Sequence, residues 1–178
     1  MTGTLVVSNT ATMGGGISMY GAAQITGITV VSNTAPYGGG IDILADVRMS
    51  GVTVISNTAT YGGGIRNQGD LTIVSSTLMG NRTTSVVGSS GGAIRSDGNL
   101  TVTASAITDN WSLTGGGLRL VPGSNTRISD SQILRNIGSY GGGGITNEGT
   151  LSLVSSLVQD NQENFTGGVA SGTPVMEA

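Results

Sequence analysis

Two aspartates hold equivalent positions in neighbouring segments of this 178-residue chain, and paired carboxylates can do chemistry. Asp46 and Asp70 each stand five residues after the isoleucine that ends a Gly-Gly-Gly-Ile tract. If the two segments stack, the carboxylates lie near the roughly 5 Å separation of a retaining glycosidase pair, or close enough to share a cation. An aspartate just before a strand also commonly bonds its own backbone in a turn. The sequence leaves both interpretations of this pair open.

Three arginines form a second candidate group, because each directly follows the apolar residue that ends a glycine tract. Arg66, Arg95 and Arg119 stand at this position in three consecutive segments. Facing outward, they would form a basic stripe that engages uronic acids or sulfated glycans with two parallel hydrogen bonds each. The alternative is a solvated surface that is balanced by the nearby Asp70 and Asp97.

Two further sets of residues recur at fixed positions. Tyr37 and Tyr61 each follow an asparagine by four residues, and stacked rings on a regular surface either bind sugar rings or cover a turn. Asp109, Arg135 and Asp160 alternate in charge at one position of successive segments. Alternating charges on neighbouring strands favour a solvated ladder of ion pairs, which we interpret as structural.

The composition excludes several kinds of chemistry. The chain has no histidine and no cysteine, so it has no disulfide, no imidazole base, no thiol nucleophile and no zinc site with nitrogen or sulfur ligands. A net charge of −3 disfavours binding to nucleic acid, which requires a positive surface. No apolar run approaches the roughly 18 residues of a membrane helix. We therefore predict no cofactor, no metal, no nucleic-acid partner and no membrane span in this segment.

The elements that must position these residues are set by a repeat of about 24 residues. A glycine-rich tract that ends in an apolar residue recurs seven times, and the last copy, Gly167-Gly168-Val169, is degraded. An asparagine recurs in register with the tracts. Aliphatic residues stand three residues before each asparagine, and in most repeats also eight and ten residues before it. The asparagines are spaced by 24 to 29 residues and are Asn9, Asn33, Asn57, Asn81, Asn110, Asn136 and Asn161.

This spacing predicts short parallel strands. Apolar residues two apart indicate a strand with one buried face, and the three-residue step to the next aliphatic position indicates a bend. The pattern predicts two strands per repeat and a third, shorter one around the glycine tract. Repeats coiled on one another bury a continuous column of Ile, Val and Leu, and their asparagine amides can bond from coil to coil. We therefore predict an all-β, right-handed parallel β-helix (solenoid) of about seven coils of about 24 residues, whose hand follows from the rule for parallel crossovers.

Several of these motifs resemble the repeats of known bacterial surface proteins. Gly91-Gly92-Ala93-Ile94 with apolar-x-x-Asn is similar to the twin repeat of the polymorphic outer-membrane autotransporters of chlamydiae, although aliphatic residues stand where that repeat usually has Phe. Residues 65–73 and 145–151 resemble more closely the Gly-Gly-Gly-Ile-x-Asn-x-Gly-x-Leu units of large surface-anchored, right-handed parallel β-helix proteins of environmental bacteria. The resemblance covers about residues 1–170. It implies a passenger scaffold for adhesion and surface display, a fold that also serves carbohydrate-active enzymes.

The domain organisation and function follow as expectations. We expect a single β-helix domain over residues 1–170 and a tail over 171–178. Because residue 1 falls within a strand of the repeat, without a cap, we expect a piece of a larger protein that is extracellular or at the cell surface. The expected function is a structural and adhesive scaffold without catalysis. Its expected partners are host, cell-surface or extracellular polysaccharides and other segments of the parent protein. The alternative is a polysaccharide-binding or polysaccharide-degrading protein of lyase or glycosidase type.

Overall fold

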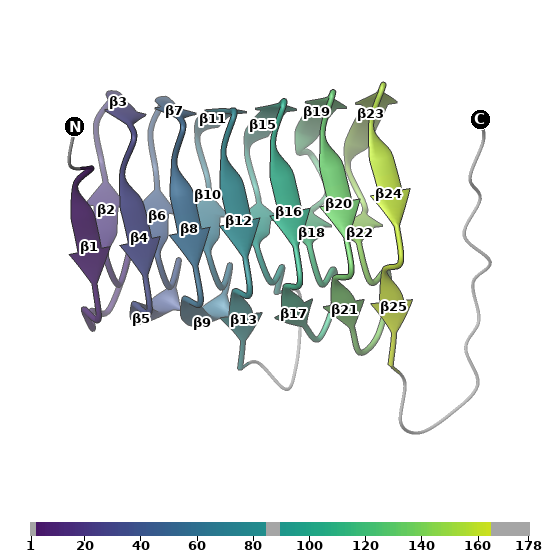
Figure 1. Ribbon diagram of the computed structural model, residues 1–178, viewed down its shortest axis with the longest axis horizontal. Coiled ribbons are helices and arrows are strands. Elements are labelled where there is room, and N and C mark those ends of the chain that lie inside the picture. The colour runs from purple at the N-terminus through teal and green to yellow at the C-terminus, as the bar shows by residue number, and fades with distance from the viewer. Residues whose placement is uncertain (1–2, 85–89, 165–178) are drawn as a thin grey trace.

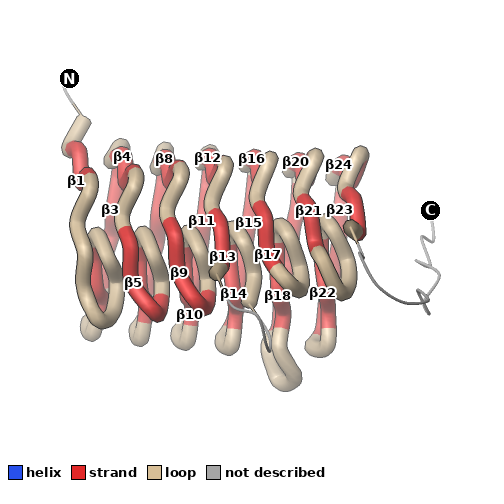
Figure 2. Tube along the Cα trace, turned by 90° about the horizontal axis from the view of Figure 1, so that it is seen from below, coloured by secondary structure: helices blue, strands red, loops and turns tan. Residues whose placement is uncertain are grey.

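The computed structural model describes residues 3–84 and 90–164, and all regular structure in them is β-strand. The strands are two to five residues long and lie in four sheets that extend along the long axis of the molecule (Figure 1). The strands of each sheet are parallel, and each pairs with its counterpart one coil away. Figure 2 shows the chain winding from coil to coil. The fold is a parallel β-solenoid, which confirms the predicted fold class, while the hand and the number of coils remain predictions.

Each sheet collects one strand from successive coils. Sheet 1 consists of β1 (Leu5–Val7), β4 (Thr29–Val31), β8 (Thr53–Ile55), β12 (Thr77–Met79), β16 (Ala106–Thr108), β20 (Gln132–Leu134) and β24 (Leu157–Gln159). Sheet 2 consists of β2 (Ile17–Met19), β6 (Ile41–Ile43), β10 (Ile65–Asn67), β14 (Ile94–Ser96), β18 (Leu118–Leu120) and β22 (Ile145–Asn147). Sheet 3 consists of β3 (Ala23–Thr26), β7 (Val47–Ser50), β11 (Asp70–Val74), β15 (Asn99–Thr103), β19 (Asn125–Ser129) and β23 (Thr150–Val154). Sheet 4 consists of β5 (Thr34–Tyr37), β9 (Thr58–Tyr61), β13 (Arg82–Thr83), β17 (Trp111–Ser112), β21 (Ile137–Gly138) and β25 (Gln162–Glu163).

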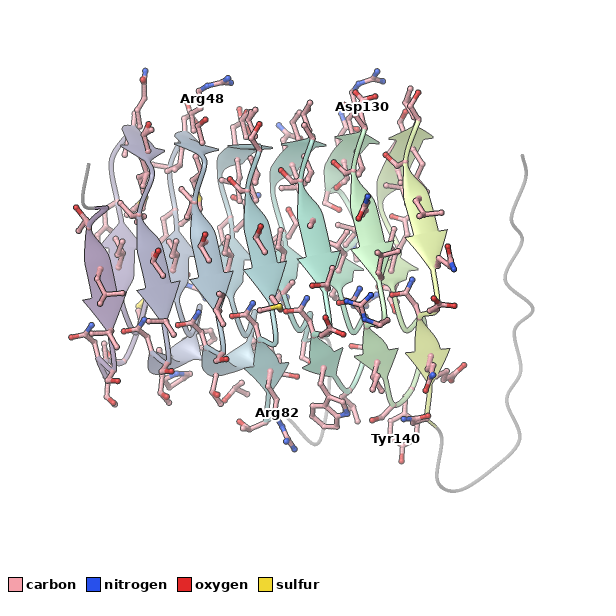
Figure 3. All side chains as sticks on the ribbon, viewed as in Figure 1. Arg48, Arg82, Asp130 and Tyr140 are labelled. Carbon is pink, nitrogen blue, oxygen red and sulfur yellow. The ribbon has the colours of Figure 1, made fainter. Side chains whose placement is uncertain are left out.

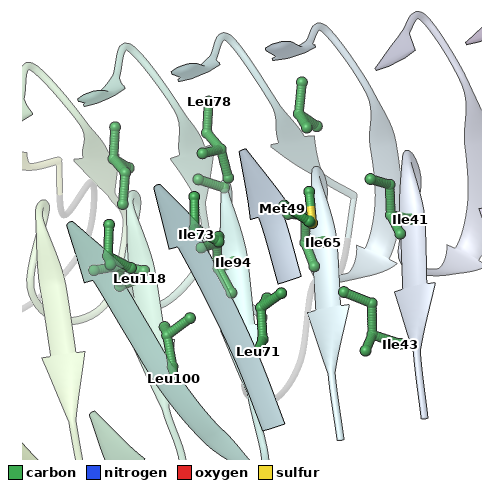
Figure 4. Packing of buried hydrophobic residues seen from close by; sticks show 14 of the residues in the cluster. Ile41, Ile43, Met49, Ile65, Leu71, Ile73, Leu78, Ile94, Leu100 and Leu118 are labelled. Atoms are coloured by element: carbon green, nitrogen blue, oxygen red, sulfur yellow. The ribbon is translucent and has the colours of Figure 1, made fainter. Parts of the chain in front are cut away.

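The core is formed by aliphatic columns that stack from coil to coil. Val30, Val54 and Leu78 pair in register on the inner face of sheet 1, and none of them is exposed to solvent. Figure 4 shows inward side chains of sheets 1, 2 and 3 packed together in the same way. Val6 and Val158, which hold the same position in the first and last described coils, are only partly buried. The aliphatic positions of the repeat are therefore the core, and each coil is covered by its neighbours.

Sheet 4 is the element that the repeat did not predict. Its strands directly follow the asparagines, and their buried positions hold small residues: Ala35, Ala59, Thr83 and Ser112. The prediction rested on columns of Ile, Val and Leu. Strands that bury only small side chains lack that signal, so this fourth side of the coil emerges only from the structure.

The glycine tracts form the corner between sheets 4 and 2. Gly38 has a φ of 57°, a left-handed conformation that glycine adopts without steric cost. A Cβ on Gly39 would lie closer than 3 Å to the carbonyl oxygens of Thr58 and Gly63 in the next coil. Successive coils therefore approach one another at this corner more closely than any residue with a side chain allows.

Left-handed residues also make the bends on either side of sheet 1. Gly27 and Gly51, with φ of 62° and 60°, lie between sheets 3 and 1. Ser32 and Ser56, with φ of 56° and 55°, lie between sheet 1 and the asparagines. The bend between sheets 3 and 1 is the one that the three-residue spacing predicted.

Candidate functional site

The asparagines of the repeat lie in one hydrogen-bonded ladder. From Asn9 to Asn136, each side-chain Nδ2 donates to the Oδ1 of the asparagine one coil further on, over 2.9 or 3.0 Å, and the last acceptor is Asn161. The backbone N–H of each of these six asparagines donates to the same Oδ1. Nδ2 also reaches back one coil, as where Asn57 bonds the carbonyl oxygen of Val30 at 3.0 Å. The five inner asparagines are fully buried, so the ladder satisfies polar groups that no water reaches.

A serine ladder, which the sequence analysis missed, runs at the bend between sheets 3 and 1. The backbone N–H of Ser76 donates to Ser105 Oγ at 3.0 Å, and that of Ser105 donates to Ser131 Oγ at 3.1 Å. Each Oγ donates in turn to the carbonyl oxygen two residues before it. The available signal was a serine five residues before the asparagine in the last four repeats. The first three repeats lack that serine, which hid the column.

Arg66, Arg95 and Arg119 stack in one column of sheet 2, in register on adjacent coils. The expectation that they form an exposed stripe is wrong for Arg66 and Arg119, which are only 8% and 5% exposed. Arg66 is paired with the fully buried Asp42 of the preceding coil, with Nε–Oδ1 and Nη2–Oδ2 distances of 2.6 and 2.9 Å. A guanidinium in such a place needs a carboxylate partner, because an unpaired buried charge carries a large desolvation cost.

The rest of this column is paired as well. Arg95 bonds Asp97, which directly follows its own strand, at 2.7 Å, and Arg119 bonds Glu148 of the next coil at 2.6 Å. Asp97 thus balances the column as expected, whereas Asp70, the other expected partner, lies on sheet 3. An anionic glycan at this column would have to compete with these carboxylates.

Tyr37 and Tyr61 stack on each other beside the same column. Their ring centroids are 5.5 Å apart and their planes differ by 15°. The guanidinium of Arg66 lies 4.4 Å from the centre of the Tyr37 ring, and that of Arg95 lies 5.3 Å from the centre of the Tyr61 ring. Protein groups therefore occupy faces of both rings, a geometry that favours covering the turn over stacking on a sugar.

Asp46 and Asp70 lie one coil apart at the start of neighbouring strands of sheet 3. The register of Val47 with Leu71 places the two exposed aspartates side by side at this edge. Asp70 Oδ1 accepts a hydrogen bond of 2.7 Å from Asn99 Nδ2. The described residues hold no group of three or more acidic side chains that could bind a metal ion. Both aspartates line a shallow depression together with Ala22, Ala23, Gln24, Val47, Arg48 and Thr72.

Asp109 and Arg135 form the exposed ion pair that their alternating charges predicted. Arg135 Nε and Nη2 donate to Asp109 Oδ1 and Oδ2, both at 2.8 Å. The hydrogen bond from Arg135 holds the pKa of the Asp109 carboxyl below its usual value. The same bond, with a smaller contribution from Asp160, raises the pKa of Arg135. This pair lies on the surface, at the bend before the asparagine ladder. An exposed ion pair stabilises the fold only modestly.

The remaining three of the seven arginines differ from these four, because no carboxylate in the described part of the chain pairs with them. Arg82 lies over the ring of Trp111, 4.4 Å from its centre. Arg48 and Arg127 are exposed on the outer face of sheet 3, and Arg48 projects away from the solenoid (Figure 3). The sequence analysis singled out neither of them: both stand nine residues before an asparagine of the repeat, but threonine holds this position in the two repeats between them, so no run of arginines marks the column.

The outer face of sheet 1 offers no charged group for binding. Its outward positions in the described strands hold aliphatic, Thr, Ala and Gln side chains, and neighbours such as Thr29 and Val31 repeat on the next coils as Thr53 and Ile55. Charged side chains capable of binding a polar ligand are therefore concentrated on the other faces.

We compared the chain with known protein families, curated proteins and solved structures. No family model, no curated protein and no solved structure matches the chain. The part of the chain that the structure describes contains no helix long and apolar enough to cross a membrane. The expected tail at 171–178 and the last glycine tract lie outside the described residues. The fold and its ladders define the class as a parallel β-solenoid repeat protein, in which buried polar groups join one coil to the next.

Proposed function

We propose that this chain is a structural and adhesive scaffold of a cell-surface or secreted protein, and that it has no catalytic activity. The observation that carries the proposal is the unbroken asparagine ladder from Asn9 to Asn161. Each of its amides bonds to a neighbouring coil, so these buried polar side chains stabilise the stack of coils. The resemblance of the glycine tracts to surface-display repeats supports the location and the adhesive role.

The candidate acid–base pair also fits a scaffold better than a catalyst. Asp46 and Asp70 are exposed, and Asp70 is engaged by Asn99. A general acid in a glycosidase works in an enclosed, partly apolar site. Neither carboxyl lies in such a site, because both face solvent at the edge of sheet 3. Both aspartates therefore suit a turn at the strand edge.

The experiment compares adhesion with turnover. The purified chain is coated on a surface and offered cells and a panel of polysaccharides, while the same polymers are incubated in solution with the chain. Release of reducing ends and of unsaturated sugar products is then measured. Retention without release supports the scaffold. Steady release that disappears in Asp46→Asn or Asp70→Asn would show an enzyme, and no retention of any cell or polymer would refute the adhesive role.

A second candidate function is binding of a polysaccharide without cleavage. Arg48 and Arg127 favour it, because they are exposed, form no ion pair with any described residue, and share one column of sheet 3. Retention of acidic but not neutral polymers in the same experiment would distinguish this function from general adhesion.

A further inference from the structure

The outer face of sheet 3 presents a straight line of polar side chains, one from each coil. The strand registers place six residues in this line, and adjacent members are about 4.8 Å apart because that is the spacing of paired strands. Every member carries a side-chain hydrogen-bond donor. The six residues, called the sheet 3 line below, are Gln24, Arg48, Thr72, Thr101, Arg127 and Ser152.

The two charges in this line are available to a ligand. Arg48 and Arg127 are both exposed, and no carboxylate of residues 3–84 and 90–164 lies within ion-pairing distance of either. They are three coils apart, a separation of about 14 Å between their strands. Thr72 and Thr101 fill the two coils between them. The line therefore places two hydroxyl donors between two guanidinium groups, at a constant step.

The depression described above lies at one end of this line. Gln24, Arg48 and Thr72 line it, and Asp46 and Asp70 line it from the strand edge. Carboxylates accept hydrogen bonds from hydroxyl groups, whereas a guanidinium binds a carboxylate or sulfate with two parallel bonds. Together these groups suit a sugar unit that carries both hydroxyls and one anionic group. The negative aspartates also disfavour the binding of small anions that have no hydroxyl groups to donate to them.

We propose that the sheet 3 line binds a linear anionic polysaccharide, built of uronic acid or sulfated sugars, that lies along the solenoid axis. Arg48 and Arg127 bind anionic groups about three coil steps apart. The threonine hydroxyls bind the sugars between them, and the depression holds one unit. The proposal rests on the second candidate function and gives it a ligand class and a surface. It assigns glycan binding to Arg48 and Arg127 of sheet 3 in place of the arginines of sheet 2.

Two double variants with the same change in net charge test the proposal. Arg48→Thr with Arg127→Thr makes all four central positions of the line threonine, as Thr72 and Thr101 already are. The control is Arg82→Thr with Arg135→Ser, which removes two positive charges from other faces. Its replacements are residues that already occur in the same columns, at Thr58 and Ser56. Far-UV circular dichroism verifies that both variants fold.

Calorimetric titration with polygalacturonate, alginate, dextran sulfate and neutral dextran measures binding at low and at 0.5 M salt. We expect the parent chain to bind one or more of the acidic polymers, and the Arg48/Arg127 variant to bind about tenfold or more weakly, because two charge-assisted contacts are lost. The control variant should keep its affinity within about twofold. Equal losses in both variants, or no loss in the first, would overturn this surface while leaving polysaccharide binding intact. Failure of the parent chain to bind any acidic polymer would overturn both.

Discussion

Removal of one asparagine from the middle of the ladder tests most directly what holds the coils together. Asn57 Oδ1 accepts bonds from the backbone N–H and from Nδ2 of Asn33, at 2.9 and 3.0 Å. Its Nδ2 donates to Asn81 Oδ1 and to the carbonyl oxygen of Val30, both at 3.0 Å. In Asn57→Ala the buried N–H of Asn33 loses this acceptor, which costs about 1–3 kcal/mol, and each lost side-chain bond adds about 1 kcal/mol. With the three side-chain bonds given above, we expect the free energy of unfolding to fall by about 4–6 kcal/mol.

The matched control lies at the first described coil. Asn9 Nδ2 donates to Asn33 Oδ1, but the backbone N–H of Asn9 bonds the same oxygen without help from the side chain. Within residues 3–84 and 90–164, no hydrogen bond is donated to Asn9 Oδ1. Asn9→Ala therefore removes one partly exposed bond and should cost about 1 kcal/mol or less.

Equilibrium unfolding in urea measures both variants. The strand signal in circular dichroism and the fluorescence of Trp111, the single tryptophan, report on the whole solenoid and on its fifth coil respectively. If Asn57→Ala fails to fold while Asn9→Ala folds, the result supports the ladder, and Asn57→Ser then provides a measurable intermediate. Losses in the two alanine variants that agree within about 0.5 kcal/mol would refute the reasoning.

Three further predictions concern the corner, the buried ion pair and pH. Gly39→Ala should lower the free energy of unfolding by about 3 kcal/mol or more, because its Cβ meets backbone of the next coil; an unchanged thermal midpoint would contradict this. Asp42→Asn should cost about 3–5 kcal/mol by leaving Arg66 buried and unpaired, and adding Arg66→Met should recover most of the loss in urea unfolding. The lowered pKa of Asp109 stabilises the fold above its unfolded pKa, and this contribution is lost as pH falls through the lowered value. Arg135→Ser should therefore be less stable than the parent at pH 7, and the difference should shrink as the pH falls through the lowered pKa of Asp109; a constant difference would contradict the assignment.

The core and the asparagine ladder could be predicted because they depend on one quantity, the repeat length. A residue that recurs at a fixed offset, such as Val30 and Val54, must stack on its counterpart once the coils are parallel. The same reasoning extends to Asn33 and Asn57. An amide has both a donor and an acceptor, so the Nδ2 of one asparagine bonds the Oδ1 of the next across a single coil step. The short strands of sheet 4 could not be found in this way, because the buried side chains there are too small to show a hydrophobic pattern.

What the sequence by itself determined is therefore the stack: the strands and inward residues of sheets 1, 2 and 3, the bend between sheets 3 and 1, and the partner of each repeat residue one coil away. The tertiary structure alone decided which arginines are buried. Arg66 and Arg48 look alike in the sequence, yet Arg66 lies buried against Asp42 while Arg48 faces solvent. That difference arises because the corner at the glycine tract brings Tyr37 over sheet 2, whereas nothing in the described residues covers the outer face of sheet 3 at Arg48. Burial and charge pairing on the outside depend on how neighbouring sheets meet, and the repeat length carries no information about that.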